Sequence, residues 1–336
     1  MDLVKTYAAA QDRYEKMPYN RVGRSGLKFP ALSLGFWHNF GDNCSYEKMR
    51  AICRKAFDLG ITQFDLANNY GPAYGSAEIN AGRILKEDFS AYRDELVITS
   101  KAGYDMWPGP YGDWGSRKYL IASCDQSLKR LGLDYVDIFY HHRMDPETPL
   151  EETMGALADL IRSGKALYAG ISNYDEEHTA QAVKIMKDLG YPLLVNQRKY
   201  SIFDRTIEED GVKEYCHENG VGVIAFCPLA QGLLTGKYLQ GIPKDSRIAT
   251  DSRFLNSSAL TKETLEQIRL LADLAAERGQ SLAQMALAWI LRDGKVCSAL
   301  IGASRPEQVE ENAKAVENTS FTQEELDRID AICRMA

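Results

Sequence analysis

The sequence of 336 residues lacks several features that would assign it to a membrane, metal-binding or nucleic-acid-binding class. No apolar run approaches the ~20 residues of a membrane-spanning helix, and we expect no signal peptide because Met1 to Lys16 has no apolar core. None of the seven cysteines forms a Cys-x-x-Cys pair, which is typical of zinc and dithiol sites. Basic residues are not in excess, since 40 Lys and Arg stand against 47 Asp and Glu. The net charge of −7 argues against a general nucleic-acid-binding surface.

The sequence also has no low-complexity tract, no internal repeat longer than one strand–helix unit and no linker. Hydrophobic residues make up 45% and charged residues 26%, which are ordinary values for a globular protein. We therefore expect residues 1–336 to form a single domain, with residues 1–16 as an N-terminal extension. The odd number of cysteines favours reduced thiols and hence a cytoplasmic protein. We expect neither a membrane nor a nucleic acid among its partners.

Short β-branched runs alternate with longer amphipathic stretches, which is the pattern of β-α units around a parallel sheet. Before them, Tyr19–Val22 and Leu27–Pro30 flank the turn sequence Gly23-Arg24-Ser25-Gly26, which predicts a hairpin. The strands expected after the hairpin are Ala31–Leu34, Thr62–Asp65, Leu96–Ser100, Val136–Tyr140, Ala166–Ile171, Leu193–Asn196, Val221–Phe226 and Ala299–Ile301. The helices expected between and after them are Tyr46–Leu59, Ala77–Lys86, Lys118–Leu131, Leu150–Arg162, Glu176–Leu189, Gly211–Asn219 and Pro306–Val316.

Eight such units predict an α/β fold, a (β/α)₈ TIM barrel, in preference to an open sheet. Too many residues separate the seventh strand from the eighth for one crossover. A long loop over residues 227–260 and two extra helices, Thr264–Arg278 and Leu282–Arg292, are expected there. A last helix is expected near the C-terminus, at residues 322–333.

The reactive groups of such a barrel lie where its strands end, at the C-terminal face. Asp65 ends the second expected strand and Tyr70 lies in the loop after it. Lys101 follows the third strand, and His142 follows the fourth. Each residue alone has an ordinary explanation, as a turn residue, a packed ring, a solvated lysine or a satisfied histidine. Together they form a set that can reduce a carbonyl group.

Carbonyl reduction needs a proton at the oxygen while a hydride reaches the carbon. Tyrosine, with an ordinary pKa of ~10, can donate that proton if a nearby cation stabilises its phenolate. We expect Lys101 to be this cation and to lower the pKa of Tyr70. Asp65 would hold the ammonium in place, and a neutral His142 would hydrogen-bond the substrate oxygen.

Other patterns in the sequence do not lead to a site. His141 and His142 do not predict a metal, because adjacent strand residues point to opposite faces. Residues 220–225 fit a Gly-x-Gly-x-x-Ala pattern, but they open a strand instead of following one, so a Rossmann-type site is not expected. The absence of Tyr-x-x-x-Lys disfavours a short-chain dehydrogenase.

Two segments resemble a known family. Phe64-Asp65-Leu66-Ala67-Asn68-Asn69-Tyr70-Gly71 resembles the first signature of the aldo-keto reductases, and Gly170-Ile171-Ser172-Asn173-Tyr174 resembles the second. The resemblance is strongest with the branch that contains bacterial reductases of phosphorylated trioses and the β subunits of voltage-gated potassium channels. It implies that Asp65, Tyr70, Lys101 and His142 form the catalytic set. Channel subunits commonly have Asn at the last position, so His142 favours a working reductase.

The resemblance also implies NADP(H) as the cofactor. The positions that match contacts to the nicotinamide ring and its carboxamide are Ser172, Asn173, Gln197 and Phe226. Arg247 and Ser304 match groups near the adenosine 2′-phosphate, which favours NADPH over NADH, and a helix that begins near Ser304 suits an anion. The other positions that match cofactor contacts are Trp37, Asp65, Pro228, Leu229, Gln231, Thr235, Lys237, Gly302, Gln308, Glu311 and Asn312.

The substrate that the resemblance implies is a small aldehyde such as L-glyceraldehyde 3-phosphate or methylglyoxal. The expected substrate contacts are Trp37, Tyr70, Trp107 and Arg143, with Arg143 available for a phosphate or carboxylate. Tyr104, Tyr111 and Trp114 belong to the same aromatic loop as Trp107. Two alternatives stay open: an NADPH-binding regulatory subunit of the channel type with little turnover, and a metal-dependent barrel hydrolase. Assembly into a homo-oligomer is a further expectation, and no metal cofactor is expected.

Overall fold

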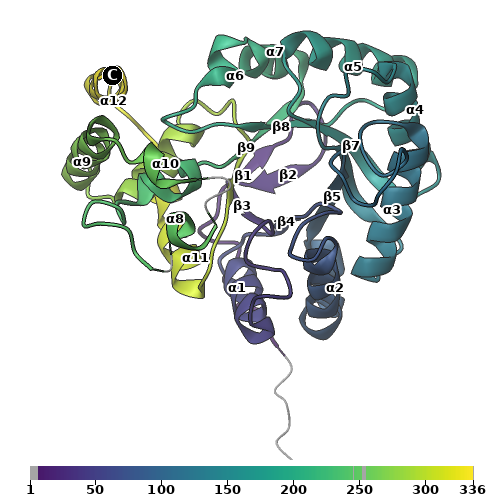
Figure 1. Ribbon diagram of the computed structural model, residues 1–336, viewed down its shortest axis with the longest axis horizontal. Coiled ribbons are helices and arrows are strands. Elements are labelled where there is room, and N and C mark those ends of the chain that lie inside the picture. The colour runs from purple at the N-terminus through teal and green to yellow at the C-terminus, as the bar shows by residue number, and fades with distance from the viewer. Residues whose placement is uncertain (1–6, 245, 252–254, 336) are drawn as a thin grey trace, which may run out of the picture.

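The computed structural model describes residues 7–244, 246–251 and 255–335, and its strands close into a parallel barrel (Figure 1). Around the barrel the strands follow in chain order, and the last pairs with the first. They are β3 (Leu32–Gly35), β4 (Gln63–Asp65), β5 (Val97–Ala102), β6 (Val136–His141), β7 (Ala166–Ser172), β8 (Val195–Lys199), β9 (Gly222–Phe226) and β10 (Ser298–Ile301). The predicted (β/α)₈ TIM barrel is confirmed.

The predicted hairpin is present as β1 (Tyr19–Arg21) and β2 (Lys28–Pro30), which pair antiparallel. Val22 and Phe29 are fully buried against side chains of the barrel interior. Gly23, with φ of +53°, packs so closely on the backbone before β9 that a Cβ there would lie 2.0 Å from the Gly220 carbonyl oxygen. The hairpin therefore closes the N-terminal end of the barrel, opposite the face where the strands end.

Helices surround the barrel in Figure 1. They are α1 (Tyr46–Asp58), α2 (Ser76–Asp88), α3 (Arg117–Leu131), α4 (Leu150–Arg162), α5 (Glu176–Asp188), α6 (Thr206–Glu209), α7 (Val212–Asn219), α8 (Arg247–Thr250), α9 (Lys262–Glu277), α10 (Leu282–Leu291), α11 (Pro306–Ala313) and α12 (Gln323–Cys333). The expected extra helices are α9, α10 and α12. Of these, α12 packs on α9 outside the barrel.

Side chains at the helix ends explain where several helices begin. The Ser116 hydroxyl accepts a hydrogen bond from the Tyr119 amide at the start of α3, and α3 ends at Gly132 with φ of +66°. Capping boxes formed by Ser281 with Gln284 and by Thr322 with Glu325 open α10 and α12. These groups satisfy backbone amides that have no partner within the helix.

Short elements account for most differences from the predicted boundaries. The helix expected at Pro306–Val316 is divided, because α11 ends at Ala313 and a 3₁₀ helix covers Lys314–Glu317. The other 3₁₀ helices are Ser90–Glu95, Ala230–Thr235 and Ser257–Ala259. Such pieces are too short to show a hydrophobic period, so the sequence did not reveal them.

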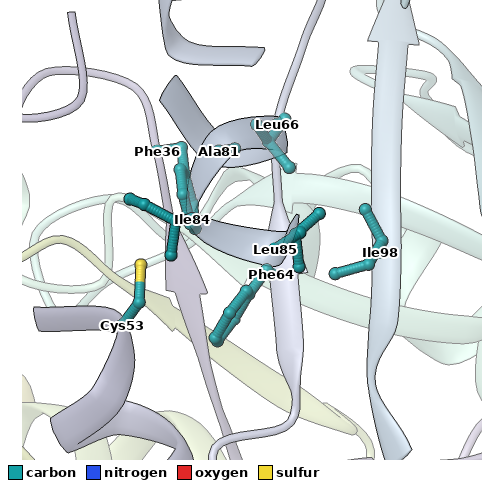
Figure 2. Close-up of a pocket in the computed structure, with 8 residues that line it drawn as sticks. All are labelled: Phe36, Cys53, Phe64, Leu66, Ala81, Ile84, Leu85 and Ile98. Carbon is teal, nitrogen blue, oxygen red and sulfur yellow. The ribbon is translucent and has the colours of Figure 1, made fainter. Parts of the chain in front are cut away.

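An apolar gap lies between the barrel wall and the helices α1 and α2 (Figure 2). Its lining consists of Phe36, Cys53, Phe64, Leu66, Ala81, Ile84, Leu85 and Ile98. The lining side chains offer no nitrogen or oxygen atom, and the space cannot hold a water molecule. This gap is therefore part of the packing and not a binding site.

The described part of the expected N-terminal extension lies against α1. The Tyr7 hydroxyl and the Ala10 amide both donate to Asp58, at 2.6 and 2.8 Å, and Arg13 pairs with Glu95 at 2.5 Å.

Within the described residues, no helix combines the length and apolar character that crossing a bilayer requires.

Candidate active site

The ends of β4, β5 and β6 bring three of the expected site residues to one edge of the barrel. Asp65, the last residue of β4, stands beside Thr99 in β5, and Lys101 lies two residues further along on the same face. His142 directly follows β6. Tyr70 lies in the loop after β4, and its carbonyl accepts a hydrogen bond of 3.2 Å from the first turn of α2. The four residues therefore meet at the C-terminal face of the barrel.

The Lys101 ammonium is the centre of this cluster. Its Nζ donates to Oδ2 of Asp65 and to the Leu66 carbonyl oxygen (2.7 Å), and it lies 3.5 Å from the Tyr70 hydroxyl oxygen. Neither side chain of the Asp65–Lys101 pair is exposed to solvent. A buried charge is strongly destabilising unless it is paired and hydrogen-bonded, and these contacts supply both.

The second carboxylate oxygen of Asp65, Oδ1, has two neutral donors. The Thr99 hydroxyl donates to it at 2.8 Å, and the side-chain amide of Gln197 donates to it at 3.1 Å. Thr99 in turn accepts a hydrogen bond of 3.3 Å from the Gln63 amide. The sequence pattern does not indicate Thr99 or Gln63 as site residues. The available signal was spacing, because each precedes a site residue by two positions on the same strand face.

His142 and not His141 faces Tyr70. The His142 ring centroid lies 5.8 Å from that of Tyr70 and 4.8 Å from that of Tyr104, both in edge-on contacts. His141 points the other way, and its Nδ1 lies 2.6 Å from the Tyr174 hydroxyl oxygen. The alternation of side chains along a strand accounts for the opposite directions of the two rings.

Burial controls the ionisation of the cluster. It lowers the pKa of His142 well below its ordinary value, and the Lys101 charge acts in the same direction, so the imidazole is neutral. Burial also lowers the pKa of Lys101, while Asp65 opposes that change. The pKa of Tyr70 is raised well above its ordinary value, first by burial and then by Asp65. The expected lowering of the Tyr70 pKa is therefore wrong, because burial and the Asp65 charge raise it.

The expected nicotinamide-side positions lie together at the ends of β7 and β8. The Ser172 hydroxyl and the backbone amide of Asn173 both donate to the backbone carbonyl oxygen of Gln197, at 2.9 and 3.1 Å. The Asn173 side chain donates to the His142 carbonyl oxygen at 3.0 Å. Asn173 has φ of +62°, a left-handed conformation that is uncommon outside glycine. These three residues therefore adjoin the cluster around Lys101.

A loop with a left-handed backbone follows Phe226, the last residue of β9. Its positive φ angles occur at Cys227 (53°), Ala230 (47°), Gln231 (60°) and Gly232 (99°). Backbone amides in such turns can converge on an anion. A Cβ on Gly232 would lie 2.9 Å from the Lys237 Nζ, so the Lys237 ammonium packs directly against the backbone of this loop at Gly232. The expected positions Pro228, Leu229, Gln231, Thr235 and Lys237 all belong to this loop.

The expected adenosine-side positions lie between β10 and the end of α11, except Arg247, which lies on α8. The Ser304 amide and hydroxyl both donate to the Gln308 side chain, at 2.8 and 3.2 Å. Gly302 directly follows β10, and α11 also carries Glu311 and the buried Asn312. Arg247 opens α8, but its side chain lies outside the described residues.

Arg143 is held by the loop at residues 103–116. Its Nη2 donates to Asp113 at 2.8 Å, and its Nε donates to a carbonyl oxygen of the same loop at 2.7 Å. The guanidinium lies between two rings of that loop, 4.3 Å from the centroid of Tyr104 and 3.6 Å from that of Trp114. Tyr104 also contacts His142, so this ring connects the loop that holds Arg143 to the cluster.

The two expected tryptophan contacts lie in different loops. The Trp107 ring packs against Tyr119 of α3, with centroids 5.0 Å apart. Trp37 follows β3 and packs on His38, with centroids 4.0 Å apart. Both rings are half-buried. Across the described residues, no group of three or more His, Cys, Asp or Glu side chains could hold a metal ion.

A model of the Aldo/keto reductase family matches residues 31–334. The chain belongs to the aldo/keto reductase family. The match runs from the start of β3 to the end of α12, so it includes every barrel strand and begins just after the hairpin. The resemblance found in the sequence is confirmed, and the chain is an oxidoreductase of this family.

Curated relatives lie in both parts of the expected branch. The chain is 58% identical over 327 residues to L-glyceraldehyde 3-phosphate reductase of Escherichia coli K12, covering 96% of this chain and 94% of that protein. It is 38% identical over 327 residues to a putative voltage-gated potassium channel subunit beta of Schizosaccharomyces pombe, covering 95% and 94%. It is 37% identical over 307 residues to a probable subunit of this kind of Arabidopsis thaliana, covering 90% and 92%.

Proposed function

We propose that this protein reduces small aldehydes to alcohols with NADPH, and that Tyr70 donates the proton. The observation that carries the proposal is the contact of 3.5 Å between the Tyr70 hydroxyl and Lys101 Nζ, with Lys101 fixed by Asp65. The raised pKa of Tyr70 keeps the phenol protonated at neutral pH, which is the form that a proton donor needs.

The residues of the cluster divide the proton chemistry among them. Tyr70 holds the proton at its hydroxyl oxygen and releases it as negative charge develops on the carbonyl oxygen. Lys101 stabilises the phenolate that this transfer leaves behind, and Asp65 keeps the ammonium in position. A neutral His142 orients the substrate oxygen by a hydrogen bond.

The left-handed turns after Phe226, with Lys237 resting on them, suit a pyrophosphate, and the groups around Ser172 suit a carboxamide. NADPH supplies the hydride when it is bound. Ser172, Asn173 and Gln197 would hold its carboxamide and Phe226 would stack on its ring. Pro228, Leu229, Gln231, Thr235 and Lys237 would follow the pyrophosphate, and Arg247, Gly302, Ser304, Gln308, Glu311 and Asn312 would bind the adenosine end.

A phosphorylated triose such as L-glyceraldehyde 3-phosphate, or methylglyoxal, is the proposed substrate class. It is supported by the relative at 58% identity that bears this substrate in its name. Trp37, Trp107 and Arg143 would contact the substrate next to Tyr70. The proposal takes residues 1–336 as one domain of a cytoplasmic protein that forms a homo-oligomer.

The channel-type relatives favour a second candidate, an NADPH-binding regulatory subunit with little turnover. The higher identity to the reductase and the presence of His142 in the cluster favour the enzyme. Continuous loss of NADPH that depends on an added aldehyde would decide for the enzyme, and binding without turnover would decide for the subunit.

The proposal is tested by measuring NADPH absorbance with a panel of aldehydes for the wild type and Tyr70→Phe. We expect the variant to lose about 10²- to 10⁴-fold in turnover, since the proton moves only in the transition state, and to keep NADPH affinity within a few-fold. Tyr19→Phe is the matched control, because it also removes one tyrosine hydroxyl, but at the hairpin, where that hydroxyl donates to the Gly60 carbonyl oxygen at 2.6 Å. Aldehyde reduction retained by folded Tyr70→Phe would contradict the assignment.

A further inference from the structure

We propose that Thr99 is a positioning residue for the Asp65–Lys101 pair and that Gln63 fixes the direction of its hydroxyl. The inference rests on the proposed function, because it concerns the reaction in which Tyr70 donates a proton. It adds two buried residues of neighbouring strands to the cluster, Gln63 of β4 and Thr99 of β5.

The contact that carries the inference joins the neighbouring strands β4 and β5. Thr99 stands beside Asp65 in the register of the two strands, and neither residue is exposed to solvent. The Thr99 hydroxyl oxygen lies 2.8 Å from Oδ1 of Asp65, the usual length of an O–H···O hydrogen bond. Since the carboxylate only accepts, Thr99 must be the donor.

Gln63 explains why the hydroxyl points at the carboxylate. A threonine hydroxyl has one proton and two lone pairs, and the Gln63 amide donates to its oxygen at 3.3 Å. The Phe64 carbonyl oxygen could also accept that proton, but it lies at 3.5 Å, the outer limit of a hydrogen bond. The donor direction therefore runs from Gln63 through Thr99 to Asp65.

The consequence for the cluster follows from the two oxygens of the carboxylate. Oδ2 accepts from Lys101, so any rotation of the carboxylate moves this oxygen away from the ammonium. Thr99 opposes that rotation by holding Oδ1. Gln197 holds the same oxygen, but it is also proposed to bind the nicotinamide carboxamide, whereas the hydrogen bonds described for the Thr99 side chain join it to Asp65, Gln63 and Phe64. Thr99 therefore keeps the ammonium aligned on Tyr70.

The test compares Thr99→Val, which removes the hydroxyl at nearly constant shape, with Thr99→Ser, which keeps it. We expect Thr99→Val to slow a single turnover with bound NADPH by about 10- to 100-fold, the range that follows from losing one hydrogen bond to a charged group. KM and NADPH affinity should stay within about threefold. Thr99→Ser should restore the rate to within a few-fold of the wild type. Gln63→Leu should cause a smaller loss, and no additional loss when it is combined with Thr99→Val.

Thr179→Val is the matched control for a merely structural effect. Thr179 lies on α5, is fully buried, and accepts a hydrogen bond of 2.9 Å from the Asn196 amide, much as Thr99 accepts from Gln63. Loss of the Thr179 hydroxyl should lower the unfolding midpoint without slowing the single turnover. Circular dichroism and the unfolding midpoint establish that each variant is folded.

The outcomes separate this inference from the proposed function. If the wild type shows no aldehyde-dependent turnover, the proposed function fails and the positioning role fails with it. If the wild type turns over and folded Thr99→Val matches its rate, or Thr99→Ser is as slow as Thr99→Val, the inference alone is overturned. A loss confined to Thr99→Val, with rescue by serine, supports it.

Discussion

Replacing Lys101 by Met separates the two roles of the ammonium, in stability and in catalysis. The side chains of Lys101 and Asp65 have no solvent exposure, so the substitution leaves a buried carboxylate without its cation. Breaking a buried ion pair in this way costs about 3–5 kcal/mol of unfolding free energy. The donors Thr99 and Gln197 remain on Oδ1 of Asp65, so we expect a loss near the lower end, ~3 kcal/mol. The same variant should lose about 10²- to 10⁴-fold in turnover, because Tyr70 loses the cation that stabilises its phenolate.

The double variant Asp65→Asn/Lys101→Met distinguishes the two effects. Exchanging both members of a buried pair for neutral groups of similar size is often neutral for stability. We therefore expect the double variant to recover most of the lost unfolding free energy while its turnover stays as low as in Lys101→Met. Urea denaturation gives the first quantity and NADPH absorbance with an aldehyde gives the second.

Two results would refute this reasoning. If Lys101→Met unfolds at the wild-type urea concentration and turns over normally, the ion pair serves neither role. If the double variant regains turnover together with stability, Lys101 supports the fold only and another group stabilises the phenolate.

Two further predictions concern the cofactor and the pH dependence. Arg247→Ala should weaken NADPH binding by about 10- to 100-fold, since charge-assisted hydrogen bonds are worth ~1.5–3 kcal/mol. NADH binding should stay nearly unchanged, because NADH has no 2′-phosphate. Fluorescence titration that finds equal losses for the two dinucleotides would show that Arg247 supports the loop instead. The rate of reduction should be constant through neutral pH and fall on the alkaline side, because the active form needs a protonated Lys101. The fall should occur below pH 10.5, the ordinary pKa of a lysine, because burial lowers the pKa of Lys101. A step near pH 6.5 in that profile would contradict the neutral state of His142, whose pKa is lowered by burial.

The expected site residues were accessible from the sequence because the fold fixes where reactive groups lie. Once eight strand–helix units are recognised, Asp65, Lys101 and His142 stand at strand ends and must converge on one edge. Alternation of side chains along β6 also separates His142 from His141. None of these inferences needs the conformation of a loop, and the structure brings these residues together.

The remainder depends on contacts between distant segments. Thr99 and Gln63 look like ordinary polar residues in strands, and only the register of β4 with β5 brings Thr99 to Asp65. The raised pKa of Tyr70 follows from burial, which the order of residues does not reveal. The pairing of Arg143 with Asp113 joins residues 30 positions apart through a loop without regular periodicity.

The interior of the barrel differs between its two sides, and this difference locates the chemistry. Beneath β6, β8 and β9 it is filled by apolar side chains such as Ile138, Val195 and Ile224, against which the hairpin packs. On one face of β4 and β5, the fully buried residues are instead Gln63, Asp65, Thr99 and Lys101. Barrel interiors are normally filled by branched apolar residues, so four polar side chains there are unfavourable unless each finds a partner. Each of the four side chains makes at least one hydrogen bond, although the Gln63 Oε1 has no partner among the described residues, and the chain of hydrogen bonds ends at Tyr70.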